Sequence, residues 1–237
     1  MEQHKIVALF DEQECEQVLH TLNNRMRSDP YLCNPFAEVK ISIYTEDLVS
    51  IPNVIYKTEA TALSHTFFEQ SDSGKLYHQP RPELGFTTVF GLPEGMVSFL
   101  NHNFSTHKKF DHQAALLSLA SQLPPSALLL DFSAGAIAML CLQNNEVIFQ
   151  RSYGIASADE LSYYLLLIIN LLALDVQSLP VYLCGIIHKD DEKYQALSRY
   201  FNTVYFLLVN DENLNSEILE NMPAHYYTTL LAVHKCG

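Results

Sequence analysis

The most regular pattern of hydrophobic and polar positions lies in the middle of the chain, from Ala127 to Tyr153 (ALLLDFSAGAIAMLCLQNNEVIFQRSY). An apolar run ends at Asp131, small residues follow, and a second apolar run leads to the dipeptide Asn144-Asn145. A third extended segment comes after this dipeptide. The pattern predicts three consecutive strands joined by two short turns.

Helical and strand patterns alternate from Ser157 onward. Ser157 and Glu160 have the spacing of a capping box, which predicts a helix over Leu161–Asp175. This helix is apolar on nearly all sides, so we expect it to be covered on nearly all sides. The other predicted elements of this half are a strand at Leu179–Cys184, a helix at Asp190–Phe201, a strand at Thr203–Val209 and helices at Glu212–Asn221 and His225–Lys235. Right-handed crossovers would place the last two strands parallel to the first of the three meandering strands.

The first half is less regular. Its predicted elements are strands at Lys5–Phe10, Val39–Ile43, Leu48–Pro52 and Leu84–Gly91, and helices at Asp11–Met26, Thr58–Phe68, from Pro93 and at Asp111–Leu123. The polar stretch Ser71–Pro82 contains one glycine and two prolines and predicts a loop. Pro124-Pro125 must end the preceding helix, so we expect two domains, residues 1–123 and 124–237.

Charge and cysteine content narrow the choice of partners and compartment. The chain has 27 acidic and 14 basic residues, for a net charge of −13. Such a surface repels phosphate backbones and anionic lipid, so we expect no nucleic-acid partner. Five cysteines without a CxxC pair suit the reducing cytoplasm. The longest apolar run, Leu161 to Leu174, is shorter than the roughly 20 residues of a bilayer span, so no membrane insertion is expected.

Three segments of the second half carry a resemblance to a known superfamily. They are Asp131-Phe132-Ser133-Ala134-Gly135, the arginine-containing stretch Gln150–Ile155, and Val181–Gly185. Together with the strand order, they resemble the repeating half of the actin, sugar-kinase and Hsp70 superfamily, and most of all its pilus-assembly ATPases. The whole chain is also similar to an uncharacterised bacterial family with an actin-like ATPase fold. The resemblance implies an α/β, ribonuclease-H-like (actin-like ATPase) fold with two mixed-sheet halves, of which the first is reduced.

The same resemblance implies a nucleotide site. Asp131 would be the catalytic carboxylate and would hold Mg²⁺ through water, while Ser133, Gly135 and Gly185 would bind the nucleotide. The sequence departs from the superfamily pattern, because Ser133 replaces a phosphate-loop glycine and Ile186 replaces the second glycine of the adenosine motif. A side chain at such positions hinders close approach of a ligand to the backbone. We therefore expect no cofactor.

Several functions are compatible with this pattern. The leading hypothesis is a cytoplasmic actin-like protein that does not hydrolyse ATP and binds an unidentified protein partner. A second hypothesis is an active Mg-ATP-dependent ATPase or small-molecule kinase that uses Asp131, and a third is an interaction module without a ligand cleft. A ribonuclease-H-like nuclease is disfavoured because Leu179–Cys184 carries no second acid for a metal pair. The ten histidines show no metal-ligand spacing, and the sequence has no Gly-x-Ser-x-Gly motif.

Overall fold

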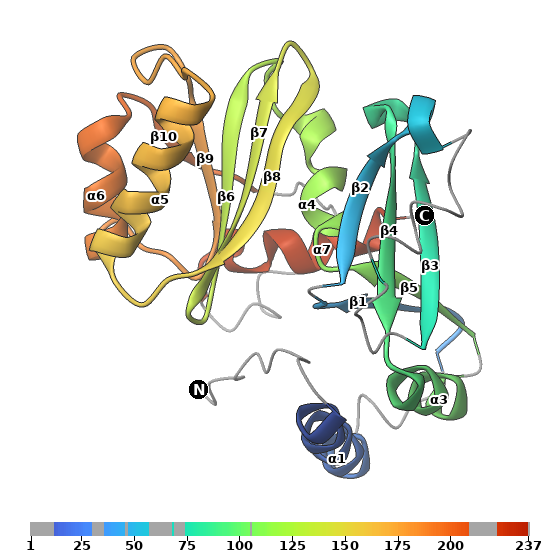
Figure 1. Ribbon diagram of the computed structural model, residues 1–237. Helices are drawn as coiled ribbons and strands as arrows, with labels where there is room; N and C mark the ends of the chain where they lie inside the picture. The colour runs from blue at the N-terminus through green and yellow to red at the C-terminus, as the bar shows by residue number, and fades with distance from the viewer. Residues whose placement is uncertain are drawn as a thin grey trace. The chain divides into compact units, whose positions relative to one another are not determined.

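The computed structural model forms two compact units, which divide between His112 and Gln113 and are called the first and the second unit below (Figure 1). The structure describes residues 12–29, 36–45, 47–56, 68, 74–104, 106–208 and 222–236. Three predicted elements lie outside these residues: the strand at Lys5–Phe10, the helix at Thr58–Phe68 apart from Phe68, and the helix at Glu212–Asn221.

A five-stranded mixed sheet is the centre of the second unit. Its strands are β6 (Ala127–Ser133), β7 (Ala136–Gln143), β8 (Glu146–Gly154), β9 (Val181–Gly185) and β10 (Val204–Phe206), in the order β10-β9-β6-β7-β8. The first three are antiparallel neighbours, and β9 and β10 run parallel to β6. Both expectations for these strands are confirmed. Asn144 and Asn145 have φ values of 54° and 67°, as a two-residue hairpin turn with left-handed backbone requires.

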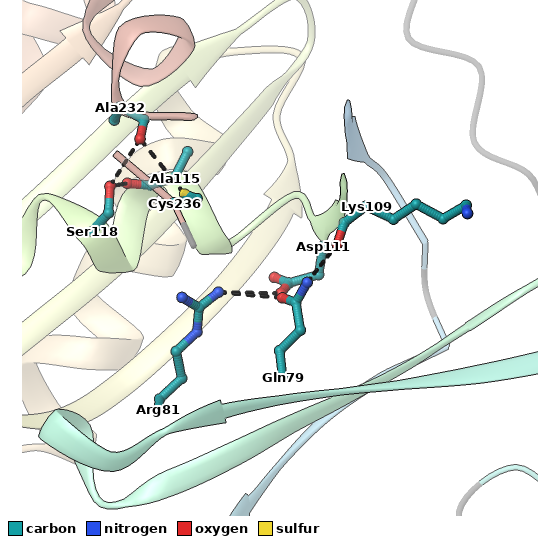
Figure 2. A network of polar contacts seen from close by, with 8 residues as sticks. All are labelled: Gln79, Arg81, Lys109, Asp111, Ala115, Ser118, Ala232 and Cys236. Carbon is teal, nitrogen blue, oxygen red and sulfur yellow. Dashed lines mark hydrogen bonds and ion pairs between the residues drawn. The ribbon is translucent and has the colours of Figure 1, made fainter. Parts of the chain in front are cut away.

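Helices cover both faces of this sheet. Helix α5 (Ala158–Leu171) and helix α6 (Glu192–Tyr200) bury residues against Leu128, Leu130 and Phe132 of β6. Helix α4 (Ala114–Ser118) and helix α7 (Thr228–His234) contact each other and lie against β7 and β9. The Ser118 hydroxyl of α4 donates to the Ala232 carbonyl of α7 at 3.2 Å (Figure 2). A short helical segment, η2 (Ala120–Gln122), follows α4.

The capping box at the start of α5 is confirmed. The Ser157 hydroxyl accepts from the Glu160 N–H at 3.2 Å, and the Glu160 carboxylate accepts from the Ala156 N–H at 2.6 Å. The first bond satisfies a donor that the first turn of a helix leaves free, while the second holds the residue before the N-cap. The acidic side chains also lie at the positive end of the helix dipole.

In the part of the first unit that the structure describes, the main elements are two small sheets and the helices α1 and α3. Strand β1 (Val39–Ile43) pairs in parallel with β5 (His107–Asp111). Strands β2 (Leu48–Pro52), β4 (Phe86–Leu92) and β3 (Lys75–Arg81) form an antiparallel sheet in the order β2-β4-β3, with η1 (Pro82–Leu84) in the β3–β4 connection. Helix α1 (Glu12–Ser28) contacts helix α3 (Glu94–Asn103). The core includes Phe90, Leu92, Met96 and Leu100.

Polar side chains join the two sheets of the first unit. Gln79 and Arg81 of β3 reach Lys109 and Asp111 of β5 (Figure 2). The Gln79 amide donates to the Lys109 carbonyl at 2.6 Å, and an Arg81 guanidinium nitrogen lies 3.9 Å from an Asp111 carboxylate oxygen. The Arg81 guanidinium also donates to the Gln79 side-chain oxygen at 3.3 Å. The network therefore fixes β3 relative to β5.

Two predictions for the first half are wrong. The stretch Ser71–Pro82 is not a loop throughout, because residues 75–81 form β3. This strand lies at the edge of its sheet. Proline is tolerated at such an edge because its missing N–H does not have to bond to a neighbouring strand. The predicted helix at Asp111–Leu123 is also wrong at its start, since residues 107–111 form β5 and α4 begins at Ala114.

The expectation that the apolar helix of the second unit is covered on nearly all sides is wrong as well. Leu161, Leu165 and Ile168 of α5 are buried, but Tyr163 and Leu171 on the same helix are well exposed. Among the described helices, none is long and apolar enough to cross a membrane.

Candidate functional site

Asp131 lies in the middle of the second-unit sheet, two residues before the end of β6. It is in register with Ala138 of β7 and with Cys184 of β9. Its neighbours Leu130 and Phe132 belong to the hydrophobic core beneath α5 and α6. Because side chains alternate along a strand, Asp131 faces the opposite side of the sheet, where α7 packs.

Three polar groups from three elements meet on that side. The Cys184 thiol of β9 donates to Oδ1 of Asp131 at 3.4 Å. The Thr229 hydroxyl of α7 also forms a hydrogen bond with the Asp131 side chain. Thr229 Oγ1 and Cys184 Sγ are 3.5 Å apart. Asp131, Cys184 and Thr229 are called the aspartate cluster below.

Burial shifts the pKa values of two groups in the aspartate cluster. It raises the pKa of Asp131, and the hydrogen bonds from Thr229 and Cys184 offset this effect only in part. Burial also raises the pKa of Cys184 well above its usual value, with a further contribution from the neighbouring Asp131 charge. The thiol therefore stays protonated and available as a donor.

Gly185 allows two backbones to approach each other directly beside Asp131. Its φ is +78°, and a Cβ placed there would lie 2.0 Å from the Phe132 carbonyl oxygen and 2.7 Å from Asp131 Oδ1. The next residue, Ile186, donates its N–H to the same Phe132 oxygen at 2.7 Å. The space that the missing side chain leaves is filled by β6 itself.

Ser133 and Gly135 lie at the β6–β7 turn and make their contacts within this hairpin and with the chain after β8. The Ser133 hydroxyl donates to the Ala136 carbonyl at 3.4 Å. Gly135 also has φ +78°, but nothing lies within 4 Å of the position its Cβ would take. Its carbonyl accepts from the Ile155 N–H at 2.8 Å. The structure thus brings Asp131 and Gly185 together, while the contacts of Ser133 and Gly135 hold the β6–β7 turn.

The C-terminal helical segment supplies residues that the sequence analysis did not single out. In η4 (Ala224–Tyr227), the His225 imidazole donates to the Ile187 carbonyl, which follows β9, at 2.8 Å. The Thr228 hydroxyl donates to the Leu207 carbonyl, which follows β10, at 2.7 Å. Burial lowers the pKa of His225, which favours the neutral ring. This segment therefore covers the carboxyl ends of the two parallel strands, where ligands bind in open α/β sheets.

The residues of the aspartate cluster do not fit a magnesium–triphosphate group well. Mg²⁺ prefers ionised carboxylates with near-octahedral access, whereas burial favours the neutral form of Asp131. The carboxyl group already accepts bonds from Thr229 and Cys184. In the part of the chain that the structure describes, no three His, Cys, Asp or Glu side chains form a group that could hold a metal ion.

We expect Asp131→Asn to raise the free energy of unfolding at pH 7 by more than the roughly 0.5 kcal/mol of a neutral surface substitution. The folded state holds the carboxyl proton more tightly than the unfolded state, because the pKa is raised on folding. The contribution of Asp131 to the free energy of unfolding therefore falls as pH rises above the ordinary carboxyl pKa. Asparagine does not ionise, so the variant does not lose this free energy. Urea unfolding between pH 3 and pH 7 should show the gain shrinking toward acid pH.

Asp175→Asn is the matched control. Hydrogen bonds from the Ser178 hydroxyl and the Gln177 N–H lower the pKa of Asp175, so its substitution should not stabilise the protein at pH 7. A loss of stability in Asp131→Asn at pH 7 would show that the charged carboxylate is favourable, against the interpretation of the aspartate cluster given above.

The sheet order and the acid-bearing β6–β7 hairpin define a protein with the actin-like ATPase fold. A protein from Bacteroides thetaiotaomicron with an actin-like ATPase fold and unknown function superposes with a TM-score of 0.72 at 17% identity, over 93% of this chain and 82% of the other. The PilM–PilN complex of type IV pilus biogenesis gives 0.53 at 12% identity, over 93% and 84%. The predicted fold class is confirmed, and the resemblance holds at the level of the fold.

The chain belongs to the family described as "Protein of unknown function (DUF3822)", whose model matches residues 2–204. No curated protein matches the sequence.

Proposed function

We propose that this protein is an actin-like-fold protein that does not hydrolyse ATP and acts by binding another protein. The observation that carries the first part is the aspartate cluster. Asp131 is the carboxylate that the superfamily pattern would assign to Mg²⁺, and here Cys184 and Thr229 of the same chain bind it. A carboxyl group held this way, with a raised pKa, is a poor metal ligand.

Two observations support a role in protein binding. The fold is shared with a structure described as the PilM–PilN complex, so the same architecture occurs in a protein assembly. Helix α5 also exposes several large apolar side chains on one face. Grouped exposed apolar residues are typical of interaction surfaces, whereas single scattered ones are not.

We further propose a cytoplasmic location. Cys141 and Cys184 are free and buried, and burial raises the pKa of Cys141 to about 11. Free thiols are stable in a reducing compartment.

Calorimetric titration with Mg-ATP, combined with a phosphate-release assay, tests the first part. We expect no saturable binding up to about 1 mM, the upper end of ordinary enzyme KM values, and no phosphate release above the level of Asp131→Ala. Micromolar binding with turnover that Asp131→Ala abolishes would instead establish the alternative, an active ATPase or small-molecule kinase.

A further inference from the structure

Helix α5 has an apolar outer face opposite its buried one. The exposed fractions are 63% for Tyr163, 42% for Leu166, 44% for Leu167 and 68% for Leu171. At about 100° per residue these four side chains fall within an arc of about 140°. They are called the α5 face below. The opposite side carries the core residues of the helix.

The composition of the α5 face is unusual for a helix that packs on a sheet. Such a helix normally turns polar and charged residues outward. Here the outward polar side chain between the leucines is Asn170, and its amide donates to the helix's own Leu166 carbonyl at 2.7 Å. A contiguous exposed apolar patch with a polar border is typical of an interaction site.

Negative charge borders the α5 face at both ends. Asp159 and Glu160 lie in the first turn, and the helix contains no lysine or arginine. Asp175 follows the helix, and hydrogen bonds from Ser178 and Gln177 lower its pKa, which keeps it ionised. The Arg151 guanidinium lies over the ring of Tyr153, which stacks on Tyr164 of the helix, so this cation is held by an aromatic ring.

These charges select among the possible occupants. A second copy docked through the same face would bring acidic residues against acidic residues, whether the helices were parallel or antiparallel. Anionic lipid would be repelled for the same reason. Residues 209–221 of this chain carry four acids and no basic residue, so they have the same sign. A segment with basic residues complements the border instead.

We propose that the α5 face binds an amphipathic segment of a partner protein, with leucine-type side chains on one stripe and lysine or arginine at both ends of that stripe. The α5 face spans about 12 Å along the helix from Tyr163 to Leu171, which matches two to three turns of a partner helix. Apolar burial supplies the affinity and the end charges fix the register. This inference rests on the proposed protein-binding function and names the chemistry of the partner.

Two synthetic helical peptides with the same leucine stripe test the proposal, one with lysines and one with glutamates at both ends. Binding is measured by fluorescence anisotropy against the full chain and three variants. Leu167→Ser and Leu171→Ser alter the α5 face without changing charge. Leu230→Ser is the matched control, because Leu230 of α7 is exposed to the same 68% as Leu171.

We expect the lysine peptide to bind, Leu167→Ser and Leu171→Ser each to weaken binding at least about tenfold, and Leu230→Ser to leave it unchanged. The glutamate peptide should not bind. The proposal is overturned if the lysine peptide does not bind, or if Leu230→Ser weakens binding as much as Leu171→Ser does, since attraction would then be unspecific. Two other results would overturn it: a dimer in sedimentation that Leu171→Ser abolishes, or binding of the protein to phosphatidylglycerol vesicles that Leu171→Ser abolishes.

The ATP experiment and the peptide experiment test different proposals, and either proposal can be refuted without the other. Turnover of Mg-ATP together with specific peptide binding would refute the non-hydrolysing function and leave the α5 face as a docking site. Absence of both turnover and peptide binding would refute the docking site alone.

Discussion

Replacing Gly185 with alanine should lower the free energy of unfolding by about 2–5 kcal/mol. Two costs add. The backbone at Gly185 has φ +78°, and this conformation costs an L-residue about 1–2 kcal/mol. The new Cβ would also lie 2.0 Å from the Phe132 carbonyl oxygen, and forcing β6 and β9 apart to relieve such a contact costs about 1–3 kcal/mol. Urea unfolding of the wild type and the variant measures the sum.

Gly135→Ala separates the two costs. Gly135 has the same φ of +78°, but its Cβ would meet nothing within 4 Å. Alanine there should therefore cost only the conformational part, about 1–2 kcal/mol. Equal losses in the two variants would show that backbone strain alone explains both glycines, and the close approach of β6 to β9 would then carry no energetic weight.

The glycine at position 185 also shows how far sequence reasoning reaches. The resemblance assigned Gly185 to a nucleotide, and in the structure Gly185 is the last residue of the buried strand β9. The structure gives the missing side chain another purpose, because the Phe132 carbonyl and Asp131 occupy the space. A sequence pattern indicates that a backbone needs room but not which group fills it.

The partners of Asp131 could not be read from the sequence for a similar reason. Cys184 is 53 residues away along the chain, and Thr229 is a further 45 residues on. Cys184 lies in the segment Val181–Gly185, but nothing in that segment or around Thr229 links either residue to Asp131 by a fixed spacing. The aspartate cluster exists only because β9 pairs with β6, and because α7 packs on β9 and places Thr229 against Asp131. By contrast, the β6–β7–β8 meander is local, and its turn residues and apolar runs predicted it well.

In the first half, β1 and β2 were predicted with their observed bounds, but β3 and β5 were missed because neither has a regular hydrophobic period. Strand β5 reads HKKFD, and its pairing with β1 joins residues far apart in sequence. Strand β3 contains a proline that usually indicates a loop, yet it pairs along its length with β4. For α5 the sequence predicted too much burial. Its apolar composition indicated a covered helix, but the α5 face is exposed in the second unit. That disagreement is the observation from which the docking proposal starts.

Arg81→Met should lower the free energy of unfolding by about 3 kcal/mol. The Asp111 side chain is fully buried, and Arg81, itself largely buried, is a cation that faces it at 3.9 Å (Figure 2). Removing the guanidinium leaves a buried carboxylate without this compensation, and it also removes the donor to Gln79. In the double variant Arg81→Met/Asp111→Asn the buried carboxylate charge is gone as well, so part of the loss should be recovered. Thermal or urea unfolding of the four proteins in this cycle measures the coupling.

The Lys108–Glu38 pair shows why burial, and not distance, sets the size of this effect. Its atoms are closer, at 3.0 Å, but both side chains are about half exposed. Water screens such a pair, and surface pairs contribute about 0–1 kcal/mol. Lys108→Met should therefore change stability far less than Arg81→Met, although it breaks the shorter contact. If the two variants lost similar amounts, the Arg81–Asp111 pair would behave as a screened surface contact, and the joining of β3 to β5 would depend on the Gln79 hydrogen bond instead.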